Sequence, residues 1–459
     1  MKPTSDTPVN IVGAGLAGAL LAVLLARRGF AVRLFERRPD PRRSVAERGR
    51  SINLALAARG IAALERAGVM EQVRPLMIPM RGRMVHDRAG TTALFPYGQR
   101  SEEVIYSVGR ALLNRVLIDE AARHSTVSVR FDQACIGVDP DRNTLRFRDL
   151  GTPEAGSASR AAEYDVPLGP TIATDGAGSA VRSSLAAGGH LSVQEEFLDH
   201  DYKELTLPAI GGRPALEVNA LHIWPRGGFM LIALPNTDNS FTATLFLARH
   251  GTNSFDSDVV ALFEREFPDT LPLIPKLITE LRDHPQGTLG TVHSAPFHVG
   301  NEVLLLGDAA HAIVPFHGQG MNAAFEDCAV LDSLLDQNPD WGVLFAQFSC
   351  RRRPNTEAIA HMALENYTEM RDTVLDPKFA RQKTIALELE RHFPRRFIPR
   401  YSMVMFHPEI PYSEALRRGT IQAEILDQLD SHRGADGKFD PVTAERLILE
   451  RLPELAANS

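Results

Sequence analysis

The stretch VNIVGAGLAGALLAVLLARRGFAVRLFE, residues 9–36, decides the fold of this chain. It begins with a strand-like run, VNIV, which leads directly into a GxGxxG turn and an apolar helix ending near Gly29. A second strand-like run, AVRLF, follows and ends at Glu36. Such a glycine turn alone is weak evidence. Between a strand and a helix, with an acidic residue closing the next strand, it predicts a dinucleotide-binding βαβ unit.

Each residue of the turn has a physical task in such a unit. Gly13 permits the tight turn, Gly15 lets the main chain approach a pyrophosphate, and Gly18 lets helix and strand pack closely. The helix aims free N–H groups and the positive end of its dipole at the phosphates. The turn residues that we expect to contact a cofactor are Gly13, Ala14, Gly15, Leu16 and Gly18.

The acidic residue that closes the unit limits the choice of cofactor. Glu36 can accept hydrogen bonds from a ribose 2′-hydroxyl, whereas its charge repels a 2′-phosphate. The bound dinucleotide should therefore be FAD or NAD rather than NADP. Arg37 and Arg38 follow, and their guanidinium groups either stack on the adenine or are simply solvated.

A second glycine-rich segment, TIATDGAGSAVR, lies at residues 171–182. It reads as a short apolar strand, then Asp175 and Gly176, then the start of a helix. We expect both residues to contact the cofactor.

A third such segment, EVLLLGDAAHAIVPFHGQGMN, covers residues 302–322. A strand over 302–306 places Asp308 at its carboxyl end, where ligands bind in open α/β sheets. A helix then begins near residue 321, after glycine-rich backbone. The cofactor contacts expected at its start are Gly320, Met321 and Asn322.

Three nucleotide-binding segments spread over 300 residues suit a long cofactor. An NAD dehydrogenase needs only the first, so we predict FAD: the first segment holds the ADP part, Asp308 a ribityl hydroxyl, and the helix at 321 the flavin. The positive end of that helix stabilises the negative charge of a reduced flavin by about 0.3–2 kcal/mol.

The composition excludes several other classes of protein. The chain has 459 residues, a formal net charge of −7, and 44% hydrophobic and 23% charged residues, which is typical of a globular protein and argues against a nucleic-acid partner. The three cysteines have no metal-ligand or CxxC spacing, so we expect buried free thiols and no metal site. The most apolar run, residues 16–26, is too short to span a bilayer. Residues 1–15 do not resemble a signal peptide, so we expect a cytoplasmic protein without a membrane span.

The three glycine-rich segments together resemble the single-component FAD-dependent aromatic hydroxylases. Further motifs narrow the resemblance to the kynurenine 3-monooxygenase family, and they are RGRSINLALAARG, RGRMVH, PYG, VPFHGQGMN, ALENYTEM and RFIPRYSM. The likeness runs from the first strand to about Arg418. It implies an α/β fold with a Rossmann-like FAD domain, a β-sheet substrate domain and a helical C-terminal region.

The resemblance also implies a site for the substrate's carboxylate. Arg83 and Tyr97 match the family's carboxylate-binding pair, and Asn366 and Tyr401 match two more substrate contacts. Met370, four residues after Asn366 on a helix, would share its face. Without the resemblance, Arg83 and Asn366 read as surface residues and Tyr401 as a core aromatic.

The segment at residues 219–247 reads as three strands joined by two turns. Alternation puts several of its apolar side chains on one face, which the family uses to cover the substrate. The four matching positions are Leu221, Met230, Ile232 and Leu234. For some of them, a sheet face packed on its own core is the alternative.

The remaining family positions lie near the flavin. Pro315, Phe316 and His317 match the wall between flavin and substrate, where Phe316, His317 and Gln319 would shape the pocket without acting as a strong base. Gln319 could touch the substrate's ketone or amine. His311 is expected to be structural. The other matching cofactor positions are Ala55, Arg110 and Cys135, although the residue before Arg110 is Gly109 where the family often has Asn.

The activity that the resemblance implies is hydroxylation of L-kynurenine to 3-hydroxy-L-kynurenine. In this chemistry NADPH reduces tightly bound FAD, dioxygen gives a flavin C4a-hydroperoxide, and its distal oxygen attacks the ring carbon next to the amine. NADPH docks only transiently, and the protein is a monomer or homodimer. The alternatives are a flavin hydroxylase of a substituted kynurenine or other anthranilate-like aromatic, a flavin halogenase, and a non-enzymatic flavoprotein.

The domains are expected to be discontinuous. The FAD-binding domain should take residues 1–75, 100–182 and 288–350. The substrate sheet should take 76–99 and 183–287, and a C-terminal helical region over 351–459 should close the active site.

Overall fold

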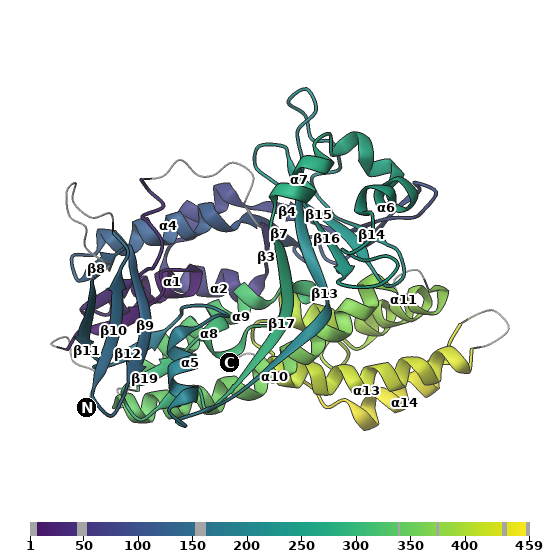
Figure 1. Ribbon diagram of the computed structural model, residues 1–459. Helices are drawn as coiled ribbons and strands as arrows, with labels where there is room; N and C mark the ends of the chain where they lie inside the picture. The colour runs from purple at the N-terminus through teal and green to yellow at the C-terminus, as the bar shows by residue number, and fades with distance from the viewer. Residues whose placement is uncertain are drawn as a thin grey trace. The chain divides into compact units, whose positions relative to one another are not determined.

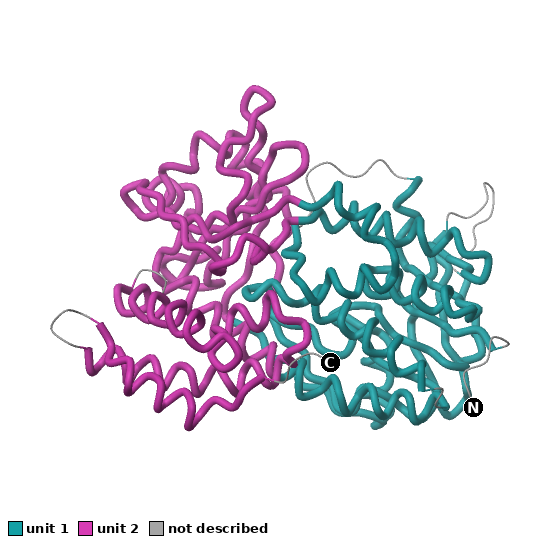
Figure 2. Tube along the Cα trace, turned by 180° about the vertical axis from the view of Figure 1, so that it is seen from behind, with its two compact units in different colours: residues 1–77, 108–198, 290–357 teal, residues 78–107, 199–289, 358–459 magenta. Residues whose placement is uncertain are grey.

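The computed structural model describes residues 7–43, 53–151, 162–337, 340–372, 376–433 and 438–455. The chain divides into two compact units, coloured separately in Figure 2. Unit 1 comprises Met1–Met77, Val108–Leu198 and Gly290–Glu357, and unit 2 comprises Ile78–Ser107, Asp199–Leu289 and Ala358–Ser459. The sequence placed the divisions near residues 75, 99, 182, 287 and 350, and it treated the C-terminal helices as a separate region. In the structure these helices belong to the same unit as the substrate sheet.

Unit 1 is built on a six-stranded sheet in the order β18-β19-β12-β1-β2-β8 (Figure 1). Its strands are parallel except for β18, which pairs antiparallel with β19. Strands β9, β10 and β11 form a separate antiparallel sheet. The strand bounds are β1 (Val9–Val12), β2 (Val32–Phe35), β3 (Asn53–Leu56), β8 (Val127–Arg130), β9 (Gln133–Asp139), β10 (Thr144–Asp149), β11 (Glu163–Pro167), β12 (Thr171–Ala173), β18 (His298–Val299) and β19 (Val303–Leu305).

Three helices of unit 1, α2, α4 and α9, pack on α1, which is buried on nearly every side. Every residue from Gly18 to Ala26 of α1 is buried, and the helix contacts both α4 and α9. This explains why its sequence is apolar throughout rather than amphipathic. The helices are α1 (Leu16–Arg27), α2 (Ala58–Ala67), α3 (Met70–Val73), η1 (Arg74–Leu76), α4 (Arg110–Arg123), α5 (Ala180–Ala187), α8 (Asp308–His311), η3 (Pro315–His317) and α9 (Gly320–Leu335).

The order in which strands are added to the sheet reverses between the neighbouring parallel strands β1 and β12. From β1 the chain continues to β2 on one side, whereas β12 lies on the other side. Such a switch point opens a crevice at the carboxyl ends of the strands. Thr174 bridges the two strand ends, because its hydroxyl donates to the carbonyls of Val12 (3.0 Å) and Gly13 (2.8 Å). The predicted glycine turn therefore lies at the ligand-binding edge of the sheet.

Unit 2 is built on a seven-stranded sheet in the order β17-β13-β16-β15-β14-β5-β6. One face packs on α6, η2 and α7 through a core that includes Trp224, Leu231 and Ala233. Strands β7, β13 and β17 and helix α10 cross the boundaries between the units. The strand bounds are β4 (Ile78–Met80), β5 (Gly82–His86), β6 (Thr92–Pro96), β7 (Ile105–Gly109), β13 (Ser192–Leu207), β14 (Leu221–Pro225), β15 (Met230–Pro235), β16 (Phe241–Ala248) and β17 (Gln286–Ala295).

The C-terminal helices have a core of their own. Side chains from α11, α13 and α14 pack together, including Ile385, Ile425 and Ile448. The last 40 residues, to which sequence reasoning gave no role, contribute α14 to this core. The helices of unit 2 are α6 (Val259–Glu266), η2 (Pro268–Leu273), α7 (Leu277–Asp283), α10 (Trp341–Arg371), α11 (Pro377–His392), α12 (Arg400–Phe406), α13 (Tyr412–Ser431) and α14 (Pro441–Arg451). Among the described residues, no helix combines the length and apolar character that a bilayer crossing requires.

Candidate active site

The three glycines of the first turn are required for different reasons. Gly13 has φ +99°, and a Cβ there would lie 2.6 Å from the Thr174 carbonyl oxygen. A Cβ on Gly18 would lie 2.0 Å from the Gly13 carbonyl oxygen, so helix and turn need this glycine to pack. A Cβ on Gly15 would meet nothing within 4 Å. The fold does not need a glycine at position 15, which fits a place kept open for a phosphate-bearing ligand.

Glu36 is held at the edge of this turn. Its carboxylate accepts hydrogen bonds from the main-chain N–H of Ala14 (2.8 Å) and of Arg38 (3.0 Å). The side chain is only half-buried, so it can also face a ribose. Arg37 and Arg38 are exposed.

One carboxylate oxygen of Asp175 accepts hydrogen bonds from the protein, and the other has no partner among the described residues. Its Oδ2 accepts from the N–H groups of Ala180 (2.9 Å) and Val181 (3.3 Å) at the start of α5. Its Oδ1 is buried without a hydrogen-bond partner among the described residues. Burial raises the pKa of this carboxyl. Beside it, Gly176 has φ +85° and open space where a Cβ would be. An unsatisfied buried acceptor next to bare backbone fits a polar ligand.

The start of α9 has main-chain donors to offer a ligand. The first intrahelical hydrogen bond runs from Ala323 N to the Gln319 carbonyl (2.8 Å), so the N–H groups of Gly320, Met321 and Asn322 have no intrahelical acceptor. Asp308, the first residue of α8, is exposed at the end of β19. Both features fit the cofactor role that their sequence positions predict.

Asn322 has a structural task that the sequence did not reveal. Its Oδ1 accepts from the N–H of Ala57 (2.9 Å), and its Nδ2 donates to the carbonyls of Ala55 (2.8 Å) and Gly318 (2.9 Å). The side chain thus ties β3 and α2 to the start of α9. Asn322 can still offer its main-chain N–H to a cofactor, and the Ala55 carbonyl keeps a second lone pair for a further hydrogen bond.

A buried charge network supports the Gly307–Asp308 turn, and sequence reasoning missed it. The fully buried Asp327 accepts from Gly307 N (3.0 Å), His311 Nε2 (2.6 Å) and Arg352 Nε (2.5 Å). Burial alone would raise the pKa of Asp327, but the neighbouring charges of His311 and Arg352 outweigh it and lower that pKa. Arg352 also pairs with Glu326 (2.6 Å), which pairs with Arg59 (2.6 Å). His311 is structural, as expected.

Five other predicted residues near the cofactor also belong to unit 1. Phe316, His317 and Gln319 are buried around the short helix η3, whereas Pro315 is exposed. Arg110 is the exposed first residue of α4.

The three cysteines are free, but only one matches the expected burial. Cys328 is buried, whereas Cys135 is half-buried and Cys350 is exposed. The expectation of buried thiols is therefore wrong for Cys350, whose position on α10 faces solvent. Burial raises the pKa of the Cys135 thiol to about 12, so at neutral pH it is protonated.

The predicted substrate residues of unit 2 gather around Arg83. Its Nη1 donates to Glu369 Oε1 (2.8 Å), its Nη2 lies 3.3 Å from Asn366 Oδ1, and its Cζ lies 5.0 Å from the centroid of the Tyr401 ring. Burial lowers the pKa of this guanidinium, but Tyr401 and Glu369 outweigh it and raise the pKa above its ordinary value. Asn366 Nδ2 lies 3.2 Å from Met370 Sδ, which confirms that these two residues share a helix face.

Two tyrosines and two unused polar atoms complete this cluster. The rings of Tyr97 and Tyr401 stack with centroids 5.5 Å apart and an angle of 12°. Burial raises the pKa of Tyr401 to about 12 and that of Tyr97 well above its usual value, so both hydroxyls stay neutral donors. The Tyr97 hydroxyl and Arg83 Nε are buried without a hydrogen-bond partner among the described residues. Buried donors of this kind favour an acidic ligand.

The strand register decides which face of the sheet the four apolar positions occupy. Leu221 pairs with Arg83, Ile223 with Ile232, and Pro225 with Met230. Paired residues share a face, and extending the register by one residue places Leu234 beside Leu221. Leu221, Met230, Ile232 and Leu234 therefore lie on the Arg83 face. Because Trp224 and Leu231 occupy the opposite face, these four positions do not face the core formed with α6 and α7.

Two charged neighbours of Arg83 were not predicted. Glu369 lies three residues after Asn366, so helical spacing could have found it. Lys383 donates to the Pro96 carbonyl (3.0 Å) and lies over the Phe95 ring (5.7 Å). Burial, aided by the charge of Arg83, lowers the pKa of Lys383 to about 8. No local signal pointed to Lys383, because it reaches this cluster only through tertiary packing.

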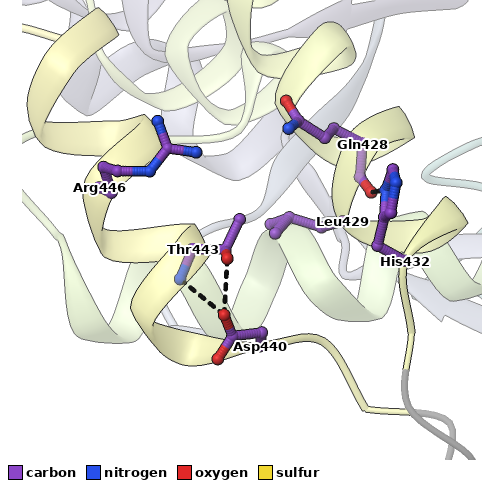
Figure 3. Close-up of a pocket in the computed structure, with 6 residues that line it drawn as sticks. All are labelled: Gln428, Leu429, His432, Asp440, Thr443 and Arg446. Carbon is purple, nitrogen blue, oxygen red and sulfur yellow. Dashed lines mark hydrogen bonds between the residues drawn. The ribbon is translucent and has the colours of Figure 1, made fainter.

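A pocket of about 250 Å³ lies between α13 and α14 (Figure 3), and none of the predicted site residues lines it. Its carboxylate, Asp440, caps α14 by accepting from Val442 N (3.3 Å) and Thr443 N (3.0 Å). His432 bonds to the Gln428 carbonyl of its own helix (2.9 Å), and Arg446 pairs with Glu450 (3.1 Å). The polar groups of this pocket thus serve the helices, and the Arg83 cluster remains the better ligand site.

Comparison with known proteins agrees with the cofactor-binding and substrate-binding features described above. Residues 6–338 match the family described as "FAD binding domain". Kynurenine 3-monooxygenase of Xanthomonas oryzae pv. oryzae (strain MAFF 311018) is 45% identical over 99% of each chain. The enzyme of that name from Stenotrophomonas maltophilia (strain K279a) is 46% identical over 97% of each. The chain belongs to the kynurenine 3-monooxygenase family. As a member of that family it contains an FAD-binding domain.

Solved structures agree on the fold. The tetrameric form of 2-methyl-3-hydroxypyridine-5-carboxylic acid oxygenase has a TM-score of 0.65 and 18% identity, covering 82% of this chain and 95% of that one. Klebsiella pneumoniae HpxO complexed with FAD and uric acid has a TM-score of 0.63 and 19% identity, covering 80% and 90%. These likenesses confirm the predicted α/β class with its Rossmann-like domain.

Proposed function

We propose that this chain hydroxylates L-kynurenine to 3-hydroxy-L-kynurenine, with FAD as its cofactor and NADPH and dioxygen as co-substrates. The observation that carries the proposal is the Arg83 cluster of unit 2. There a buried cation and a buried tyrosine hydroxyl retain unused donor atoms beside an apolar sheet face. Such a site suits a ligand with a carboxylate at one end and an aromatic ring at the other.

The residues of unit 2 would bind and orient the substrate. Arg83 and Tyr97 donate to its carboxylate, and Asn366 and Tyr401 complete that contact. The apolar residues would line the ring, and they are Leu221, Met230, Ile232, Leu234 and Met370. Because the amine of kynurenine already activates the ring, the protein need only orient it and exclude water.

The residues of unit 1 would bind the cofactor and shape the pocket. Bound FAD supplies the activation of dioxygen. The glycine turn from Gly13 to Gly18 would receive the pyrophosphate and Glu36 a ribose, while the N–H groups at the start of α9 face the flavin. The further contacts are Arg37, Arg38, Ala55, Arg110, Cys135, Asp175, Gly176 and Asp308. Pro315, Phe316 and His317 would form the wall toward the substrate, and Gln319 would contact its ketone or amine.

The decisive experiment is NADPH oxidation by the purified, FAD-loaded protein with a panel of aryl amino acids, with products identified by mass. We expect 3-hydroxykynurenine from L-kynurenine and slower turnover of other anthranilate-like compounds. NADPH consumption without a hydroxylated product from any of them would contradict the proposal. A cytoplasmic location and a monomeric or homodimeric state remain predictions from sequence.

A further inference from the structure

Tyr97 lies on a short segment that helix α11 holds in place. The segment, residues 95–100, continues from the end of the edge strand β6. On one side, Tyr97 N donates to the Arg81 carbonyl (3.1 Å). On the other side, Lys383 of α11 donates to the Pro96 carbonyl (3.0 Å). The main chain around Tyr97 is therefore bound both next to β5 and to α11.

The segment's second tie to α11 is the side-chain amide of Gln99. Its Nε2 donates to the Leu387 carbonyl (2.8 Å) and to Glu390 Oε2 (2.8 Å). Its Oε1 accepts from Arg391 Nε. Leu387, Glu390 and Arg391 share one side of the helix by their spacing, and Lys383, four residues before Leu387, extends the same row. One face of α11 thus binds the segment at several points.

Glu390 is a buried acid with both oxygens turned toward this segment. Its side chain is 1% exposed, its Oε2 accepts from Gln99, and its Oε1 lies 3.3 Å from Arg100 Nη2. The core that α11 shares with α13 and α14 is apolar and includes Ile385 and Leu389, so it does not require an acid. A buried charge is costly unless it is paired. The task of this acid in the fold is to hold the segment.

A second buried acid fixes the turn that follows Tyr97. Glu103 accepts from the main-chain N–H groups of Gln99 (2.6 Å) and Arg100 (2.8 Å). A Cβ on Gly98 would lie 2.1 Å from Glu103 Oε2, which explains the glycine of the PYG motif. The Arg100 guanidinium bridges the two buried acids. The chain therefore has one fixed path beyond Tyr97.

We propose that α11 sets the position of the Tyr97 hydroxyl for the substrate's carboxylate, with Glu390 as the positioning residue. This inference rests on the proposed function and deepens it. Glu390 does not touch the substrate in this role. It acts through Gln99 and Arg100, which fix the main chain just beyond Tyr97. Because a hydrogen bond weakens steeply with misalignment, freeing this segment reduces affinity for the carboxylate.

The test is a double-mutant cycle on Glu390 and Tyr97. Dissociation constants for L-kynurenine are measured from the flavin absorbance change of the FAD-loaded full chain. Tyr97→Phe should weaken binding about 10- to 100-fold, the loss expected for one hydrogen bond to a carboxylate. Glu390→Ala should weaken binding at least about 5-fold when Tyr97 is present. In the Tyr97→Phe background it should change binding less than about 2-fold, because the hydroxyl that it positions is already gone.

Three further variants make the result specific. Gln99→Ala breaks the same tie from the half-buried side and should repeat the cycle, which covers the case that Glu390→Ala does not fold. Glu390→Gln keeps an acceptor for Gln99 and should recover most of the affinity lost in Glu390→Ala. Glu388→Ala is the matched control, because Glu388 is exposed on the same helix, and it should bind like the wild type.

The contrary outcomes separate this inference from the proposed function. A purely structural role of α11 would lower the affinity equally with and without the Tyr97 hydroxyl. If the effects of Glu390→Ala and Tyr97→Phe multiply in the double variant, or if Glu390→Ala and Gln99→Ala both bind like the wild type, the inference alone is overturned. If the wild-type chain neither binds L-kynurenine nor hydroxylates it, the proposed function fails and this inference fails with it.

Discussion

Replacing Asp327 by Asn should destabilise unit 1 far more than its small chemical change suggests. Asp327 is fully buried and both its oxygens accept hydrogen bonds, Oδ2 from Gly307 N and His311 Nε2 and Oδ1 from Arg352 Nε. An amide has one acceptor oxygen, so its NH₂ group must face at least one of these donors. Breaking a buried ion pair by removing one partner costs about 3–5 kcal/mol. For a folding unit of roughly 150–250 residues, this lowers the melting temperature by about 6–20 °C.

The assay is thermal unfolding of the full chain, followed by flavin fluorescence so that the transition reports on the FAD-binding unit. Asp336→Asn is the matched control, because Asp336 pairs with Arg28 at 2.7 Å but is 59% exposed. An exposed pair contributes at most about 1 kcal/mol. Since Asp327 holds the main chain at Gly307, its loss should also weaken FAD binding. Equal melting temperatures for the two variants would refute the view that this network holds the turn.

Three further predictions concern the glycine turn, the carboxylate site and the buried histidine. Gly15→Ala should weaken FAD binding without changing the stability of the FAD-free chain, whereas Gly18→Ala should lower that stability. The reason is that only the Cβ added at position 18 meets backbone atoms. Melting curves with and without FAD test both predictions. Arg83→Met should raise the dissociation constant of L-kynurenine by at least about 100-fold, the loss expected for two charge-assisted bonds, while FAD stays bound; an unchanged constant would contradict the carboxylate role. Burial lowers the pKa of His222 to about 4 from 6.5, so the unfolded chain binds more protons between these values. Stability should therefore fall by roughly 3 kcal/mol as the pH drops through that window and be unaffected above it; a His222→Gln variant with the same pH profile would show the effect to lie elsewhere.

The cofactor-binding half of the fold could be predicted because its signals are local. The strand, turn, helix and second strand of residues 9–36 follow one another in the chain. Gly13 and Gly18 are required by close contacts with neighbouring backbone, and Gly15 leaves space in which a ligand could lie. The strand triplet of unit 2 was equally clear from alternation and its two turns. Alternation could not say which face packs on the protein's own core. That depends on α6 and α7, which follow later in the chain.

The charged partners could not be predicted, because tertiary structure brings them together. Asp327 and Arg352 have no periodicity that marks them as a pair, and Lys383 lies 300 residues from Arg83 in the sequence. Asn322 has a structural task that its motif did not reveal. Its position beside the flavin motif predicts a cofactor contact, and its side-chain amide in addition binds main-chain groups of residues 55, 57 and 318.

A buried polar residue with a structural role differs from a ligand-binding one in its hydrogen bonds. The polar atoms of the first are bonded to the protein, whereas those of the second have no partner in the protein. The side-chain polar atoms of Asp327 and Asn322 form hydrogen bonds within the protein, so these side chains do not require a ligand. Arg83 and Tyr97 are also buried, yet Nε of Arg83 and the hydroxyl of Tyr97 have no hydrogen-bond partner among the described residues. An unsatisfied buried donor costs about 1–3 kcal/mol, which a folded chain tolerates where a ligand regains it. Two such donors in one cluster, on the same side of the sheet as the apolar positions, are the reason for proposing unit 2 as the place where the substrate binds.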